Sequence, residues 1–312
     1  MSKSDNPKNF IDLVDWSRSE LGALLNLAAE LKLAPEKFSQ ALAGKSLAMI
    51  FKKSSTRTRV SFEVGMFQLG GQAIFMSSAN TQVGRGEPLK DTARVLSRYV
   101  DGIMIRTFDH IEVETLAQYA TVPVINGLTD FLHPCQVLTD IFTIKERLGL
   151  ELNALDGLKV AYIGDGNNMA NSWINAALRF GFDLKIACPA GYEPDARLLA
   201  QVNRQSSGSG RVVVVLDPLA AVKGAKVLNT DVWASMGQED EARARRQVFA
   251  GYQINDKLLN VAAPDLLVMH CLPAHRGEEI TAEVFERYQD LIFTQAENRL
   301  HVQKALLVTL LS

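Results

Sequence analysis

Hydroxyl and guanidinium side chains gather in the segment Ser54–Arg59 (SSTRTR), which stands between an expected strand and an expected helix. The first turn of a helix has free backbone N–H groups and the positive end of the helix dipole, and both favour an anion. The hydroxyls add neutral donors, and Arg57 adds a planar fork that fits two oxygens of a phosphate. Because a plain helix cap needs only one Ser or Thr, this cluster predicts a phosphate- or carboxylate-binding site.

A second polar turn, Gly164–Asn168 (GDGNN), follows the expected strand KVAYI. It resembles the start of a dinucleotide fingerprint, but Met169 stands in place of the third glycine, and no acid follows the next strand to hold a ribose. We therefore expect a tight turn that aims Asn167 or Asn168 at a ligand, rather than a nicotinamide site.

The segment His133–Gln136 (HPCQ) begins an expected long helix, with Pro134 at the favoured first position. His133 and Gln136 then lie one turn apart and can face one ligand. Taken alone, a histidine at a helix start is more often structural than catalytic.

The segment His270–Pro273 (HCLP), with His275 after it, raises the question of a metal. Neighbouring residues of a strand point to opposite faces, so His270 and Cys271 converge poorly on one ion. The zinc-binding spacings C-x-x-C and H-E-x-x-H do not occur in the sequence, and we expect no metal. Cys271 has no base near it along the chain, although a distant histidine could approach it in the fold.

The elements that position these residues are short apolar runs with amphipathic helices between them, a pattern typical of the α/β class with mostly parallel sheets. Ten strands are many for one sheet, so we expect two sheets of four or five strands flanked by helices. The joint is expected at 148–157, after a helix over 134–147, and a last helix is expected at 297–311. The expected strands are 46–51, 72–76, 102–105, 122–125, 159–163, 184–188, 212–216, 227–230, 266–269 and 291–293.

Polar residues follow these strands at the ends where open parallel sheets bind ligands. In the first half of the chain they are cations, hydroxyls and an amide, among them Lys53, Arg106 and Asn126. In the second half they are amides and acids, at Asp165–Asn168 and Asp231. This asymmetry predicts an anionic ligand on one side and an amine-bearing ligand on the other.

The composition excludes several classes of protein. Of the 312 residues 47% are apolar, and 33 Lys and Arg stand against 35 Asp and Glu, without the basic excess of a nucleic-acid binder. No apolar run reaches the 18 residues of a membrane span, and the N-terminus is polar. The cysteines, Cys135, Cys188 and Cys271, are too sparse for a disulfide framework. We therefore expect a cytoplasmic enzyme with neither a membrane nor a nucleic acid as partner.

Four motifs resemble those of the aspartate/ornithine carbamoyltransferase family, namely Ser55–Arg59, His133–Gln136, Asp231–Gly237 (DVWASMG) and His270–Pro273. The similarity extends over nearly the whole chain and includes GRGEP at 84–88, DTARV at 91–95 and QAENR at 295–299. The Ser-Met-Gly and His-Cys-Leu-Pro segments mark the ornithine branch, since the aspartate branch usually has His-Pro-Leu-Pro at the latter position.

The resemblance implies two α/β domains bridged by the middle helix and the C-terminal helix. Residues 1–147, completed by 297–312, would bind carbamoyl phosphate, and residues 148–296 would bind ornithine. The reaction would give L-citrulline and phosphate, as in arginine biosynthesis, without a cofactor because carbamoyl phosphate arrives activated. The family's usual assembly is a homotrimer or a multiple of trimers, in which Gln82 would reach a neighbour's site.

The resemblance also assigns roles to single residues. The phosphate would be held by Ser55, Thr56, Arg57 and Thr58. The carbonyl oxygen would be faced by Thr58, Arg106 and His133, and the carbamoyl end would be oriented by Gln136, Cys271, the Leu272 carbonyl and Arg299. The amino acid would be held by Asn168, Asp231, Ser235 and Met236. Asp231 and Cys271 would lie near the reacting amine, and either could help remove its proton.

Two alternatives stay open at this point. One is a carbamoyltransferase for putrescine or aspartate, against which Asp231 and the segment 235–237 argue. The other is a non-catalytic homologue, which would have lost some of the cationic or loop residues, and none is missing. The sequence leaves the biosynthetic or catabolic direction undecided.

Overall fold

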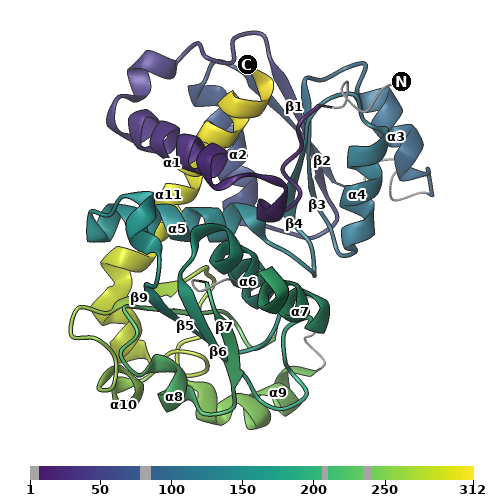
Figure 1. Ribbon diagram of the computed structural model, residues 1–312. Coiled ribbons are helices and arrows are strands. Elements are labelled where there is room, and N and C mark those ends of the chain that lie inside the picture. The colour runs from purple at the N-terminus through teal and green to yellow at the C-terminus, as the bar shows by residue number, and fades with distance from the viewer. Residues whose placement is uncertain (1–6, 78–85, 206–209, 235–240) are drawn as a thin grey trace. The chain divides into compact units, whose positions relative to one another are not determined.

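A computed structural model of the chain describes residues 7–77, 86–205, 210–234 and 241–312 (Figure 1). The chain forms two compact units, Met1–Cys135 with Arg299–Ser312 and Gln136–Asn298. Each unit contains one parallel sheet flanked by helices, with four strands in the first unit and five in the second. The α/β class and the two mostly parallel sheets that the sequence predicts are thus confirmed.

The first sheet has the strand order β2-β1-β3-β4, with all pairs parallel. β1 and β3 are almost wholly apolar and buried, as expected of parallel strands that are covered on both faces. β2 lies at the edge, and its residues are half-buried or exposed. The strands are β1 (Ser46–Phe51), β2 (Gln72–Ser77), β3 (Gly102–Arg106) and β4 (Val124–Leu128).

The helices of the first unit include a capped N-terminal helix and the end of the C-terminal helix. Ser17 and Glu20 form a reciprocal capping box at the start of α1. A Cβ on Gly102 would lie 2.6 Å from Leu311 Cδ2, so this glycine lets the end of α11 approach β3 closely. The helices are α1 (Arg18–Leu33), α2 (Thr56–Gln68), α3 (Leu89–Leu96), α4 (His110–Tyr119) and, from Arg299 onward, α11 (Ala282–Leu311).

The second sheet has the order β7-β6-β5-β8-β9, again with all pairs parallel. Its strands are β5 (Lys159–Ile163), β6 (Asp183–Ala187), β7 (Val212–Val215), β8 (Val227–Thr230) and β9 (Leu267–His270). Its helices are α5 (Pro134–Leu148), α6 (Asn168–Phe180), α7 (Ala196–Gln205), α8 (Pro218–Val222), α9 (Ala242–Phe249), α10 (Asp256–Leu259) and the first part of α11. Short 3-10 helices complete the described chain at η1 (Leu13–Asp15), η2 (Pro35–Phe38), η5 (Leu152–Leu155) and η7 (Ala250–Tyr252).

Both sheets place their first strand in the interior, so each has a point where the chain switches sides. In the first unit this point lies between β1 and β3, whose last register pair is Phe51 with Arg106. In the second unit it lies between β5 and β8, whose last pair is Ile163 with Thr230. Ligands of open parallel sheets bind at the carboxyl ends of such strands. The segments after β1, β3, β5 and β8 are therefore the places to look for chemistry.

One expected strand is wrong. Residues 291–293 lie inside α11, where Ile292 is buried and Phe293 is 52% exposed, as on two sides of a helix. Three apolar residues in a row are too few to distinguish the periodicities of strand and helix. The other nine expected strands agree with the observed bounds to within three residues.

The boundary between the units also differs from the expected one. The sequence places residues 1–147 in the first unit, whereas contacts begin the second unit at Gln136. The reason is that α5 bonds to the start of α11, with Gln295 Nε2 2.7 Å from Asp140 Oδ1 and Asn298 Nδ2 3.0 Å from Thr143 Oγ1. Among the described residues, no helix combines the length and the apolar composition that a membrane span needs.

Candidate active site

The hydroxyl–arginine cluster stands at the start of α2, as the sequence predicts. Ser55 is the N-cap, and its Oγ accepts from the backbone N–H of Thr58 at 3.1 Å. Thr58 is fully buried, and its Oγ1 accepts from Arg106 Nη1 at 3.3 Å and from Arg299 Nη2 at 2.9 Å. A hydroxyl that accepts from two guanidinium groups keeps its own proton for another acceptor. Residues from α2, β3 and α11 thus converge within the first unit.

His133 lies among positive charges in the same unit. It is 5% exposed, and burial lowers the pKa of its ring well below the ordinary value, with Arg299, Arg106 and Arg57 adding to the effect. The imidazole is therefore neutral at pH 7 and able to donate one N–H. A neutral ring on which three guanidinium charges act forms a setting that attracts an anion.

Two other residues near this cluster are fixed by partners of their own. Lys53 is buried, pairs with Asp130 and lies 4.5 Å from the centre of the Phe108 ring. Burial raises the pKa of the Cys135 thiol to about 12, and its Sγ donates to the Asn126 carbonyl at 3.4 Å. Neither side chain has the reactive or open character of a catalytic group.

Gln136 lies in the first turn of α5 and is 1% exposed. Its Nε2 donates to Asp140 Oδ1 at 2.7 Å, and that same oxygen accepts from Gln295. Its Oε1 is buried and has no hydrogen-bond partner among the described residues. Because an unpaired buried acceptor is costly, this oxygen is suited to receive an N–H group of a ligand.

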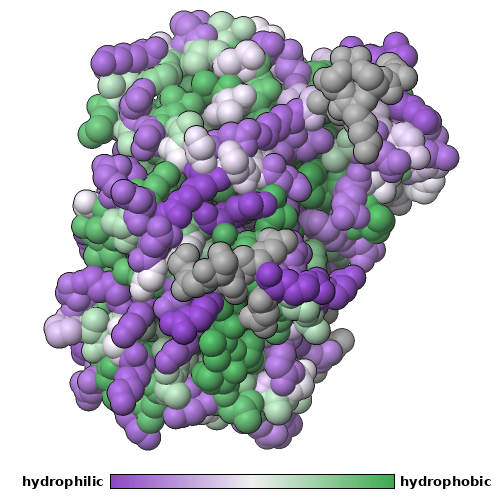
Figure 2. Space-filling model, in the orientation of Figure 1, coloured by the Kyte–Doolittle hydropathy of each residue, from purple (hydrophilic) through white to green (hydrophobic). Residues whose placement is uncertain are grey.

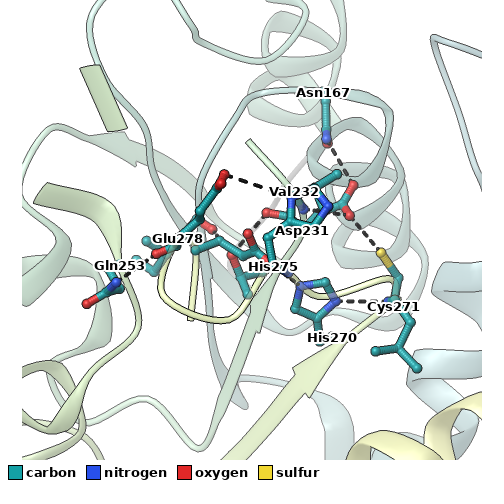
Figure 3. A network of polar contacts seen from close by, with 12 residues as sticks. Asn167, Asp231, Val232, Gln253, His270, Cys271, His275 and Glu278 are labelled. Carbon is teal, nitrogen blue, oxygen red and sulfur yellow. Dashed lines mark hydrogen bonds and ion pairs between the residues drawn. The ribbon is translucent and has the colours of Figure 1, made fainter. Parts of the chain in front are cut away.

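Asp231 follows β8 and is the centre of a polar network in the second unit (Figure 3). Its Oδ1 accepts from the Val232 N–H at 2.8 Å and from Cys271 Sγ at 3.0 Å. Its Oδ2 accepts from Asn167 Nδ2 at 3.0 Å. All three donors are neutral, so within the described residues they hold the carboxylate in place without cancelling its charge.

The orientation of Asn167 is fixed by its own partners. Its Oδ1 caps α6 by accepting from the N–H groups of Met169 at 2.9 Å and Ala170 at 3.3 Å. The hydroxyl of Tyr162, which is buried on β5, donates to the same oxygen at 3.1 Å. The amide nitrogen must then face Asp231. Of the two candidates in the GDGNN turn, Asn167 supports the carboxylate, and Asn168 lies half-buried at the first position of α6.

His270 and Cys271 face different partners, as the strand geometry predicts. His270 Nδ1 accepts from the Leu272 N–H at 2.9 Å, which places the ring proton on Nε2, 3.0 Å from Glu279 Oε1. His270 and Glu279 are both fully buried, and Figure 3 shows Cys271 turned toward Asp231. Leu272 has a φ of 60°, an unusual conformation for leucine that its bond to the His270 ring helps to hold.

Some site residues emerge only in the fold, and some of the expected ones lie outside the described residues. Glu279, Asn167 as the partner of Asp231, and Tyr162 emerge only in the fold, because long-range pairing leaves no local signal in the sequence. Gln82, Ser235 and Met236 lie outside the described residues.

One group of described side chains has the composition of a metal site. It consists of His275, Glu278 and Glu279, whose ligand atoms lie within 4.8 Å of one another. Glu279 Oε1 in this group already accepts from His270 Nε2 and from the His275 N–H.

Comparison with known proteins gives matches to both units. The family model described as aspartate/ornithine carbamoyltransferase, carbamoyl-P binding domain, matches residues 8–146, and the Asp/Orn binding domain of the same family matches residues 156–310.

Among curated relatives, the chain is 56% identical to an ornithine carbamoyltransferase of Pelobacter propionicus over 97% of this chain and 98% of that one. It is 57% identical to one of Syntrophotalea carbinolica over 98% and 99%.

Solved structures agree with this assignment. An anabolic ornithine carbamoyltransferase from Campylobacter jejuni superposes with a TM-score of 0.91 at 44% identity, covering 97% of this chain and 98% of that one. An ornithine carbamoyltransferase from Pyrococcus furiosus superposes with a TM-score of 0.91 at 48% identity and 99% coverage of both chains. The resemblance drawn from the motifs is thereby confirmed, and the chain belongs to the aspartate/ornithine carbamoyltransferase family.

Proposed function

We propose that this chain transfers the carbamoyl group of carbamoyl phosphate to the δ-amine of L-ornithine, giving L-citrulline and phosphate. The observation that carries the proposal is the opposite charge of two polar clusters. The positive charges of Arg57, Arg106 and Arg299 act on His133 in the first unit, and the Asp231 carboxylate is held by neutral donors in the second. The two curated relatives described above are both named ornithine carbamoyltransferase, which supports the proposal.

The phosphate is assigned to the start of α2. The N–H groups of the first turn, the hydroxyls of Ser55, Thr56 and Thr58, and the Arg57 fork together suit a dianion. As the bond to phosphate breaks, negative charge grows on the leaving oxygens. Donors that are fixed beforehand stabilise this charge without having to reorganise during the reaction.

The carbonyl oxygen is assigned to Arg106, Thr58 and His133. Because its pKa is lowered, the imidazole of His133 acts as a neutral hydrogen-bond donor and does not lose or gain a proton in the step. We assign the orientation of the carbamoyl end to Arg299, the Gln136 side chain, Cys271 and the Leu272 carbonyl. The unpaired Oε1 of Gln136 supports its part, since a carbamoyl NH₂ would supply the missing donor.

The amino acid is assigned to Asn168, Asp231, Ser235 and Met236. In the reaction the lone pair of the δ-amine forms a bond to the carbonyl carbon, and the bond from that carbon to the phosphate oxygen breaks. The phosphate leaves with the electron pair, and the amine nitrogen loses one proton. Asp231 and Cys271, which share a hydrogen bond of 3.0 Å, are the groups we assign to that proton.

We also propose a homotrimer or a multiple of trimers, with Gln82 reaching a neighbouring subunit. Polar residues cover most of the face seen in Figure 2, but apolar patches interrupt them. Phe67 on α2 is 80% exposed, and Ile74 and Phe75 on the edge strand β2 are 41% and 37% exposed. Exposed apolar side chains on a helix and on an edge strand are suited to contact with a partner subunit. Light scattering should give a mass three or more times that of the 34.3 kDa chain, and a monomer would contradict the proposal.

The chemistry of the cysteines and the likeness to a relative support the cellular setting that we propose. All three cysteines are free thiols, which fits a reducing compartment such as the cytoplasm. The likeness to the anabolic enzyme of Campylobacter jejuni supports a role in arginine biosynthesis.

One assay tests the activity itself. Purified protein is given carbamoyl phosphate with ornithine, putrescine, aspartate or acetylornithine, and the carbamoylated product and phosphate are measured. Citrulline formation should be at least about 100-fold more efficient than any other transfer, as expected when a polar site rejects substrates that leave its groups unpaired. A faster reaction with aspartate or putrescine would reassign the substrate, and no transfer to any amine would indicate a non-catalytic homologue.

A further inference from the structure

The Arg245 side chain on α9 joins separate segments of the second unit. Its Nη1 donates to Asp165 Oδ2 at 2.8 Å and to the Trp233 carbonyl at 3.0 Å. Its Nε donates to Glu241 at 3.0 Å, and the guanidinium lies 5.1 Å from the centre of the Tyr192 ring. The Arg245 and Asp165 side chains are only 9% and 10% exposed, so their ion pair is largely shielded from water.

Asp165 stands at the turn that supports Asp231. It follows β5 and is separated by Gly166 from Asn167, whose amide holds the Asp231 carboxylate. Gly166 lets this turn pack closely against the next segment, since a Cβ there would lie 2.3 Å from the backbone of Glu193. Trp233, the other group that Arg245 holds, follows Asp231 by two residues and stacks on Phe249 at 5.9 Å.

The two carboxylates at this edge of the sheet are treated differently. Burial raises the pKa of Asp165, the nearby Asp231 charge raises it further, and Arg245 opposes both. Asp165 thus has the Arg245 guanidinium as its cationic partner. Asp231 accepts, among the described residues, from an amide, a backbone N–H and a thiol, all of them neutral. The negative charge of Asp165 is thus cancelled by Arg245, whereas that of Asp231 is left for a ligand.

We propose that Arg245 is a positioning residue that neutralises Asp165 and thereby leaves Asp231 as the single carboxylate that the cationic amino acid meets. The inference rests on the proposed function and deepens it by naming what sets the charge of the ornithine half of the site. Arg245 acts through Asp165 and Trp233 and is assigned no contact with substrate.

Removing the cation has two consequences. A buried carboxylate without a partner is strongly unfavourable, so Asp165 would attract another cation, and the ammonium group of ornithine is the cation supplied in the assay. The Trp233 carbonyl would also lose its donor, which loosens the segment that begins at Asp231. Both consequences weaken the use of ornithine and leave the phosphate cluster of the first unit untouched.

The test is a charge cycle with a matched control. Arg245→Met, Asp165→Asn, the double variant and Arg245→Lys are compared in steady-state citrulline formation, with carbamoyl phosphate affinity measured by calorimetry on the same samples. Arg246→Met is the control, because Arg246 is the next residue of α9, is half-exposed and pairs with Glu278.

For Arg245→Met we expect the KM for ornithine to rise at least tenfold, with the affinity for carbamoyl phosphate changed less than twofold. The double variant should recover at least threefold of that loss, because it removes the uncancelled charge. Arg245→Lys should stay within about threefold of the parent chain, since it keeps the charge but not the planar fork. Arg246→Met should leave both constants unchanged.

Asp165→Asn keeps the proposal testable if Arg245→Met does not fold. This variant keeps a hydrogen-bonding side chain but leaves the Arg245 charge to act on Asp231, so the KM for ornithine should rise at least threefold. A normal KM in Asp165→Asn, or a double variant no better than Arg245→Met, would overturn the proposal. Failure of the proposed function would be distinct, since the parent chain itself would then form no citrulline.

Discussion

The two units use the same architectural position for opposite charges. In each sheet the first strand is interior, and the polar groups follow the strands on either side of the switch point. In the first unit these groups are Thr58 and Arg106, which Arg299 joins from α11. In the second unit they are Asn167 and Asp231. The sheet supplies the position, and the side chains after each strand decide which ligand is attracted there.

The two clusters also differ in how their buried charges are balanced. The first holds several cations near a neutral histidine, whose pKa is lowered first by burial and further by the charges of three arginines. The second pairs one of its two carboxylates with Arg245 and leaves the other with neutral donors. An excess of one sign is therefore built into each cluster, and changes of charge in one cluster should affect one substrate and spare the other.

The largest expected effect comes from a substitution in the proposed phosphate site. Arg57→Lys keeps the positive charge but loses the planar fork, and turnover should fall at least ~100-fold, the loss that a transition-state contact of ~2.7 kcal/mol represents. Arg59→Lys is the matched control, since Arg59 is exposed and paired with Glu63 at 3.0 Å. Near-normal turnover in Arg57→Lys would remove the phosphate assignment.

The second prediction concerns a substitution in the proposed ornithine site. Asp231→Asn keeps the shape but removes the charge, and kcat/KM for ornithine should fall about 30-fold, as for the loss of a charged hydrogen bond of about 2 kcal/mol. Calorimetry should find carbamoyl phosphate binding nearly unchanged. If the affinity for carbamoyl phosphate fell equally, Asp231 would instead support the fold.

A third prediction concerns pH and the nucleophile. A free δ-amine resembles lysine, with a pKa of about 10.4, so only about one molecule in 2,500 is neutral at pH 7. Because only the neutral form attacks, kcat/KM for ornithine should rise from pH 6 to about pH 8 by up to about tenfold per unit.

Cys271→Ser should shift the pH at which this rise levels off, because Cys271 is hydrogen-bonded to Asp231. Pre-steady-state measurements would establish whether chemistry is rate-limiting. A flat profile under that condition would mean that the amine is not the nucleophile.

The smallest expected effect is on stability, and it concerns how the free energy of unfolding depends on pH through His133. Unfolded His133 takes up a proton near pH 6.5, whereas the folded residue does so only at lower pH. The unfolded state therefore binds more protons below pH 6.5, and the free energy of unfolding decreases as the pH falls, by at most about 1.4 kcal/mol per unit from this residue.

Urea unfolding at pH 7.5 and pH 5.5 measures this contribution. His133→Gln should lose about 1 kcal/mol less than the parent chain between these values. His110→Gln is a second test, because burial lowers the pKa of His110 too and this variant should also lose less than the parent chain. Equal losses in the parent chain and His133→Gln would show that His133 is not held neutral.

The sequence was most informative where chemistry is concentrated in a short segment. The Ser54–Arg59 cluster and the His133–Gln136 helix start were predicted because residue types and helix geometry act over a few residues. The expected strand at 291–293 was wrong because three apolar residues show no period. The roles of Glu279 and Arg245 could not be predicted, because only the fold brings each to its partner. Glu279 pairs with His270, and Arg245 pairs with Asp165 across 80 residues of sequence.

One crossed binding measurement tests the central claim most directly. The affinities of carbamoyl phosphate, and of L-ornithine in the presence of saturating inorganic phosphate, are measured by calorimetry for the parent chain, Arg57→Lys and Asp231→Asn. The account predicts that Arg57→Lys loses carbamoyl phosphate affinity and Asp231→Asn loses ornithine affinity, each by at least tenfold, with less than a threefold change in carbamoyl phosphate affinity for Asp231→Asn. Equal losses of both ligands in both variants would contradict the division of charge between the two units.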